Sequence, residues 1–221
     1  MRGRFITFEG GEGSGKSTHA ALVAERLAAL GLEVVRTREP GGSPGAEIIR
    51  HILLSGIAKP LGAETEAMLF AAARDDHVRS VIVPALASGK WVVCDRFVDS
   101  TRVYQGVLGH VDPKLIRSLE RVTVGPAMPD LTIVIDVPAS VGLARATRRR
   151  AGGPADRYES ETIDFHERLR AAYRALAAEE PARIVLVDGR PPRDVVAARI
   201  WEIVEQRLAP GRAPALHGTA P

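Results

Sequence analysis

Several residue types are scarce in this chain of 221 residues, and each scarcity excludes a class of protein. The one cysteine, Cys94, cannot form an intramolecular disulfide or a cysteine-rich metal site, so we expect a reducing, cytoplasmic setting. No run approaches the roughly 20 apolar residues of a membrane-spanning helix, and the N-terminus lacks a signal-peptide core. Aromatic residues make up only 5% of the chain, and charges of both signs are interspersed. The net charge of +3 therefore does not by itself indicate nucleic-acid binding.

Lysine and asparagine are also scarce. Lysine occurs at four positions, whereas 26 of the 30 basic residues are arginine, and asparagine is absent. Coding bias explains most of this excess, because the chain is also rich in alanine, glycine and proline. Recognition of phosphate is the alternative for particular arginines, because a guanidinium group matches phosphate oxygens with two parallel hydrogen bonds.

The 45% of hydrophobic residues are arranged as short β-rich runs that alternate with helical patterns. Such alternation predicts an α/β fold of the P-loop NTPase type, a five-stranded parallel sheet covered by helices on both faces. We expect one domain over residues 1–208 and a disordered tail over residues 209–221, which are rich in proline and glycine. A long helical pattern over residues 64–88 contains Pro84, which predicts a kink or break. The strands are expected at residues 4–9, 33–37, 91–95, 131–137 and 183–187.

The sequence GGEGSGKST directly follows the first expected strand and precedes a helix. It satisfies the P-loop pattern, in which glycines allow backbone N–H groups to surround a phosphate and the helix N-terminus adds its dipole. Lys16 is expected to reach the β- and γ-phosphates, and Ser17 to bind Mg²⁺. The expected nucleotide-binding residues are Gly10, Gly11, Glu12, Gly13, Ser14, Gly15, Lys16, Ser17 and Thr18.

ATP is the expected nucleotide. A GTPase of the Ras type carries an N-K-x-D motif, which a chain without asparagine cannot contain, and a D-x-x-G switch, which is also absent. A transport or motor ATPase remains possible, although the chain leaves little room for a coupling domain.

Two further groups of charged residues point to phosphoryl transfer. Asp95 and Arg96 lie at the end of the third strand, at the carboxyl edge where parallel sheets bind ligands, so Asp95 could hold Mg²⁺ and Arg96 could contact phosphate. A second group surrounds a glycine- and proline-bearing loop and is typical of a lid, over residues 145–160, that excludes water and supplies an arginine to the reaction. The alternative for Asp95 and Arg96 is an ordinary ion pair at a strand end. The alternative for the second group is a solvated, arginine-rich helix end. The second group comprises Arg145, Arg148, Arg149, Arg150 and Arg157.

Taken together, these segments resemble the thymidylate kinase family from Phe5 to about Leu208. The matching segments are FEGGEGSGKST, TREPGG, MLFAAAR, DRFVDSTRVYQG, PDLTIVIDV and DRYE. The resemblance implies transfer of the γ-phosphoryl group of ATP to dTMP, with Mg²⁺, in a homodimer. Phe97 departs from the family, which often has tyrosine or histidine there, and the lid is somewhat long.

The resemblance also implies roles for particular residues. Phe70 would stack on the thymine ring and Arg74 would bind its O4, while Ser100, Tyr104 and Gln105 would face the base and sugar. Arg50 and Arg96 would hold the monophosphate, and Glu12 would lie near the sugar 3′-hydroxyl. Because the P-loop has no arginine, the lid is expected to supply the catalytic one, Arg149. Lys16, Arg96, Arg149 and Asp95 are thus the expected catalytic residues.

The chemistry agrees with this interpretation, because a phosphomonoester is already an anionic nucleophile and needs no general base. No histidine therefore has to be enlisted. A kinase of a deoxynucleoside or of another monophosphate remains an alternative, and so does an ATP-binding module without turnover.

Overall fold

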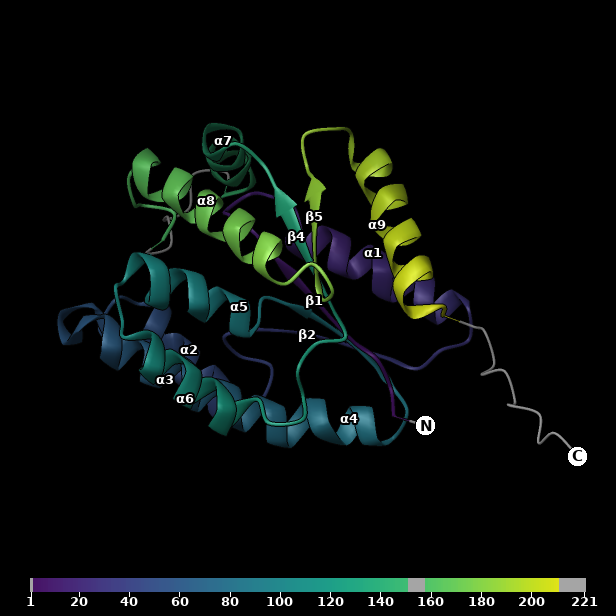
Figure 1. Ribbon diagram of the computed structural model, residues 1–221, viewed down its shortest axis with the longest axis horizontal. Coiled ribbons are helices and arrows are strands. Elements are labelled where there is room, and N and C mark those ends of the chain that lie inside the picture. Colours follow the sequence, from purple (N-terminus) through teal and green to yellow (C-terminus); the bar gives the residue numbers. More distant parts are fainter. Residues whose placement is uncertain (1, 151–157, 211–221) are drawn as a thin grey trace, which may run out of the picture.

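The computed structural model describes residues 2–150 and 158–210. Five parallel strands form one sheet, as the sequence predicts, and the structure gives their order as β2-β3-β1-β4-β5. Their bounds lie within two residues of those expected, and the sheet runs through the centre of Figure 1. The strands are β1 (Phe5–Glu9), β2 (Val34–Arg38), β3 (Trp91–Asp95), β4 (Leu131–Asp136) and β5 (Ile184–Asp188).

Helices cover both faces of the sheet because successive strand residues point to opposite sides. Ile6 and Phe8 of β1 pack against α1 (Lys16–Ala29) and α9 (Arg193–Leu208). Phe5 faces the opposite side, where it packs with the segment around Val78 and Leu86. The remaining helices on that side include α8 (Ile163–Glu179), which packs on β4 and β5.

The long helical pattern around Pro84 is interrupted, as expected. α3 (Gly62–His77) continues as a π-helical segment, η2 (Val78–Ile82), and then as α4 (Val83–Ala87). A proline lacks the N–H group that an α-helix donates to the carbonyl four residues earlier, so a wider turn before Pro84 is a physically reasonable response. A second π-helical segment, η3 (Arg102–Leu108), follows the short helix α5 (Val98–Thr101).

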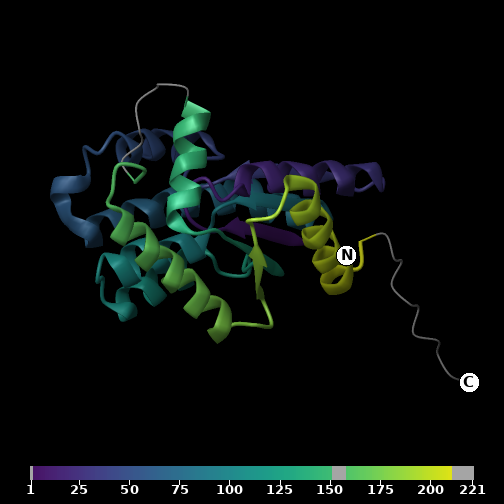
Figure 2. The same cartoon turned by 90° about the horizontal axis from the view of Figure 1, so that it is seen from above.

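Local signals mark the remaining helices. α2 (Pro44–Leu54) and α6 (Pro113–Thr123) begin with proline at the first helical position, where its missing N–H costs nothing. The Asp112 side chain caps α6 by accepting a hydrogen bond from the N–H of Lys114 at 2.7 Å. The short helix η1 (Lys59–Leu61) precedes α3, and α7 (Ala139–Arg150) stands out from the rest of the molecule in Figure 2. None of the helices in the described ranges has the length and apolar character needed to cross a membrane.

Candidate active site

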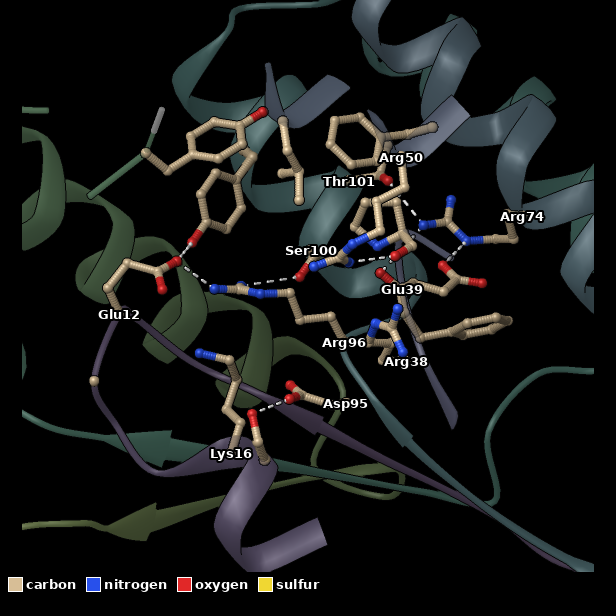
Figure 3. Close-up of a pocket in the computed structure, with 18 of the residues that line it drawn as sticks. Glu12, Lys16, Arg38, Glu39, Arg50, Arg74, Asp95, Arg96, Ser100 and Thr101 are labelled. Atoms are coloured by element: carbon tan, nitrogen blue, oxygen red, sulfur yellow. Dashed lines mark hydrogen bonds and ion pairs between the residues drawn. The ribbon is translucent and has the colours of Figure 1, made fainter. Parts of the chain in front are cut away.

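A cavity of about 350 Å³ opens at the carboxyl ends of β1 and β3 (Figure 3). Its volume is in the range of small-molecule sites. One end is lined by the P-loop residues Gly13, Lys16 and Ser17, and the other by Phe70 and Arg74 of α3. The structure therefore joins the two groups of residues that the sequence assigned to two different nucleotides.

The P-loop connects β1 to α1 by a backbone path that glycine permits. Gly10, Gly13 and Gly15 have φ angles of 131°, 64° and 100°, which side-chain-bearing residues rarely adopt. Gly13 also lies against α7, where an added Cβ would be 1.9 Å from the carbonyl oxygen of Gly142. The Lys16 ammonium donates to the carbonyl oxygen of Gly11 at 2.8 Å, so the loop itself holds the lysine over the place expected for phosphate.

The hydroxyl of Ser17 donates a hydrogen bond to the Asp95 carboxylate, which joins the start of α1 to the end of β3. The other carboxylate oxygen of Asp95 is buried and has no hydrogen-bond partner among the described residues. A hydroxyl beside a carboxylate with a spare oxygen suits Mg²⁺, which commonly takes one or two protein oxygens and fills its other positions with waters and substrate phosphates. No group of three or more acidic, histidine or cysteine side chains within residues 2–150 and 158–210 could hold a metal.

An acidic residue of the P-loop, Glu12, is paired with Arg96. The Arg96 guanidinium donates to the Glu12 carboxylate, and the Tyr104 hydroxyl donates to the same oxygen at 3.2 Å. Burial alone would raise the pKa of Glu12, but the positive charges of Arg96 and Lys16 outweigh it and lower the pKa to about 2. Glu12 is therefore ionised at neutral pH.

Arg96 is held in a left-handed backbone conformation, with a φ of 67°. Non-glycine residues in this region cost about 1–3 kcal/mol and tend to occur at functional sites. Its N–H donates to the carbonyl oxygen of Phe8 at 2.9 Å, and its guanidinium carbon lies 5.3 Å from the centre of the Tyr104 ring. The tight turn after β3 thus directs the side chain of Arg96 across the cavity toward the P-loop.

The residues expected to bind dTMP all line the cavity, and Phe70 and Arg74 lie at the end away from the P-loop. Phe70 is half-buried and lines the cavity, so it does not belong to the closed core. Arg74 is buried and donates to Glu39 at 2.8 Å and to Thr101 at 3.0 Å. The remaining expected residues Arg50, Ser100, Tyr104 and Gln105 also line it.

The lid residues are only partly brought to the cavity. Arg149, at the end of α7, lines the cavity and pairs with Glu159 at 3.0 Å. Arg150 also faces Glu159, at 3.4 Å. Arg145 instead donates to the carbonyl oxygen of Gly189 at 3.0 Å, so it fastens α7 to the segment after β5. Arg157 and the remaining loop of the expected lid lie outside the described residues, as does most of the expected tail.

Several further residues at the site have no role predicted from the sequence. Glu39 follows β2 at the same edge of the sheet as Asp95, and the signal was available because it lies inside the TREPGG segment. Arg38 and Tyr158 line the cavity as well. Glu9 lies behind it, fully buried at the end of β1.

The parallel sheet, the P-loop with its lysine and the cavity that extends from it to α3 define a P-loop protein of the nucleoside monophosphate kinase class. Comparison with known proteins identifies the family within this class. The family profile described as Thymidylate kinase matches residues 8–200, and the chain belongs to that family.

Individual curated relatives and a solved structure agree with this family assignment. A thymidylate kinase of Nitrobacter winogradskyi is 61% identical over 94% of this chain and 90% of its own length. One of Bradyrhizobium diazoefficiens is 59% identical over 95% and 92%. The crystal structure of thymidylate kinase from Ehrlichia chaffeensis has a TM-score of 0.74 at 31% identity, over 93% of this chain and 99% of that one.

Proposed function

We propose that the protein transfers the γ-phosphoryl group of ATP to dTMP, giving dTDP for DNA precursor synthesis. One observation carries this proposal: in a chain of the thymidylate kinase family, the P-loop lysine and an aromatic–arginine pair line the two ends of one cavity. Phosphate and pyrimidine sites joined in this way allow the two substrates to meet end to end.

In the proposed reaction, the dTMP phosphate oxygen attacks the γ-phosphorus and ADP leaves. Both reactants are anions, so the protein must cancel charge and hold the two phosphates in line. Lys16 and Arg96 lie near each other at the phosphate end of the cavity (Figure 3). Arg149 of α7 also lines the cavity. We assign Arg50 and Arg96 to the monophosphate of dTMP, Lys16 to the triphosphate and Arg149 to the transferring group.

Mg²⁺ would be held by Ser17 and Asp95, and it supplies neutralisation of charge on the phosphate oxygens when bound. Glu12 would accept a hydrogen bond from the sugar 3′-hydroxyl, which its low pKa favours because a carboxylate is an acceptor only. At the base end, we assign Phe70 to stacking, Arg74 to thymine O4, and Ser100, Tyr104 and Gln105 to the base and sugar.

We also propose a homodimer and a cytosolic location. Two large apolar side chains are exposed beside the cavity: Ile48 of α2 is 67% exposed and Met68 of α3 is 47% exposed. These two helices pack against each other beside the cavity, so a second copy covering them would remove apolar surface from water. Cys94 is a buried free thiol, which suits a reducing compartment.

The test is phosphoryl transfer from ATP to a panel of dTMP, dCMP, AMP and thymidine, in wild type and in Lys16→Ala. We expect the highest kcat/KM with dTMP and a loss of turnover of 10²-fold or more in the variant, because its phosphate-contacting charge is removed. A preference for thymidine, dCMP or AMP would indicate another small-molecule kinase. Absence of ADP formation with every acceptor would indicate a non-catalytic ATP-binding module.

A further inference from the structure

Three buried charged or polar side chains form a connected row behind the base end of the cavity. Arg74 and His77 lie three residues apart on one face of α3, and Glu39 lies just after β2. Their exposed fractions are 3%, 0% and 6%. One Glu39 oxygen accepts from Arg74 Nε at 2.8 Å, and the other lies 3.0 Å from His77 Nδ1.

The hydrogen bonds of Arg74 leave one edge of its guanidinium group for a ligand. Nε donates to Glu39, and Nη2 donates to the Thr101 hydroxyl at 3.0 Å (Figure 3). Nη2 also donates to the carbonyl oxygen of Phe97 at 3.3 Å. Nη1 has no hydrogen-bond partner in the part of the chain that the structure describes, and Arg74 lines the cavity. The plane of the group is therefore fixed while its free edge offers donors alone.

His77 holds the Glu39 carboxylate in place, and Glu39 in turn holds Arg74. Its second ring nitrogen, Nε2, lies 2.7 Å from the Thr37 hydroxyl, so turning the imidazole would break hydrogen bonds on both sides. The loop after β2 also closes over this pair, because a Cβ on Gly42 would be 2.4 Å from the Thr37 oxygen and 2.5 Å from His77 Nε2. With both oxygens occupied, the Glu39 carboxylate has a single orientation.

We propose that His77 and Glu39 are positioning residues that aim Arg74 at the pyrimidine and thereby set the preference for thymine over cytosine. This inference rests on the proposed function, in which Arg74 donates to thymine O4. Cytosine carries an amino group at the corresponding position, so a fixed donor meets another donor there. An Arg74 released from Glu39 could swing aside, and the penalty against cytosine would fall.

The primary test compares wild type, His77→Ala and His77→Asn with dTMP and dCMP. We expect His77→Ala to raise the KM for dTMP about tenfold and to lower the ratio of kcat/KM for dTMP to kcat/KM for dCMP about tenfold. A change of this size corresponds to the loss of one buried hydrogen bond. The KM for ATP should stay within about twofold, because the row does not touch the P-loop. His77→Asn should recover most of the ratio, since its amide can place a polar atom near Nδ1.

Val78→Ala is the matched control for loss of stability. Val78 is the next residue, is 4% exposed and packs into the core cluster around Phe97. Thermal unfolding measures how far each variant is destabilised, and Val78→Ala should leave the dTMP-to-dCMP ratio unchanged. If His77→Ala does not fold, Glu39→Gln is measured for the same ratio with the same expectation.

Several outcomes would overturn the inference. These are an unchanged ratio in His77→Ala, an equal loss in Val78→Ala, or no recovery in His77→Asn. Two further measurements separate this failure from failure of the proposed function. A wild type that does not prefer dTMP refutes the function itself, and Arg74→Ala shows whether the preference depends on Arg74. A wild type whose preference depends on Arg74 but not on His77 refutes the positioning role alone.

Discussion

Glu9 provides a test of how burial and charge compete beneath the active site. Its side chain is fully buried and accepts hydrogen bonds from the N–H groups of Phe97 and Ser100, at 2.8 and 3.2 Å, and from the Ser100 and Tyr173 hydroxyls, at 2.7 and 2.9 Å. Burial, followed by the nearby charge of Asp99, raises its pKa from 4.5 to about 7, although Arg96 and the hydrogen bonds act in the opposite direction.

The sign of the resulting pH dependence follows from which state binds the proton. Between pH 4.5 and about 7 the folded protein keeps a proton on Glu9 that the unfolded chain has lost, so raising the pH destabilises the fold in this window. A rise in pKa of this size corresponds to a change of about 3 kcal/mol in the free energy of unfolding across the window. The low pKa of Glu12 contributes stability that is already complete above pH 4.5, so it does not vary in the same window.

The perturbation is Glu9→Gln, which has nearly the same shape but no ionisation. Its amide oxygen can accept from the two N–H groups, and its amide nitrogen can donate to the hydroxyls. We expect the free energy of unfolding of the variant, relative to wild type, to rise by about 2–3 kcal/mol between pH 5 and pH 8. Urea unfolding at a fixed protein concentration measures it at each pH. A difference that stays constant across this range would refute the reasoning.

Two further predictions concern phosphoryl transfer. Asp95→Asn removes a charge from the expected Mg²⁺ ligand, so the Mg²⁺ concentration for half-maximal activity should rise about tenfold or more, measured by titration of activity with Mg²⁺; an unchanged midpoint would count against the assignment. Arg149→Ala should lower kcat by about 10³-fold, the lower range for an arginine of this type, with a smaller change in the KM for ATP. Arg148→Ala on the same turn is the matched control, and an equal loss there would contradict the choice of Arg149.

The fold could be predicted from sequence because its signals are local. Apolar β-rich runs separated by helical patterns specify a parallel sheet, and Gly31 and Gly89 mark the ends of α1 and α4 with φ angles of 81° and 80°. The interruption near Pro84 was also expected, because a missing N–H group is a property of one residue. Its π-helical form was not, since neighbouring packing decides how the backbone absorbs the missing bond.

The site was harder to predict where one side chain orients another from a distant position in the sequence. The P-loop is contiguous, so its spacing identifies Lys16 and Ser17 directly. The row of Glu39, Arg74 and His77 joins residues up to 38 positions apart, and no spacing rule reveals that a buried imidazole holds a carboxylate. A reaction without a general base gave no reason to consider any histidine, although His77 bears on orientation.

Four of the cations that line the cavity are each paired with an oxygen atom of the protein. Arg96 is held by Glu12, Arg74 by Glu39 and Arg149 by Glu159, while Lys16 is held by a backbone carbonyl. Each partner restricts a long side chain that would otherwise lose rotamer freedom on binding. The acidic residues of this site therefore do not work against phosphate binding. They fix the direction of each donor, and a substrate that presents its oxygens along those directions is favoured over one that does not.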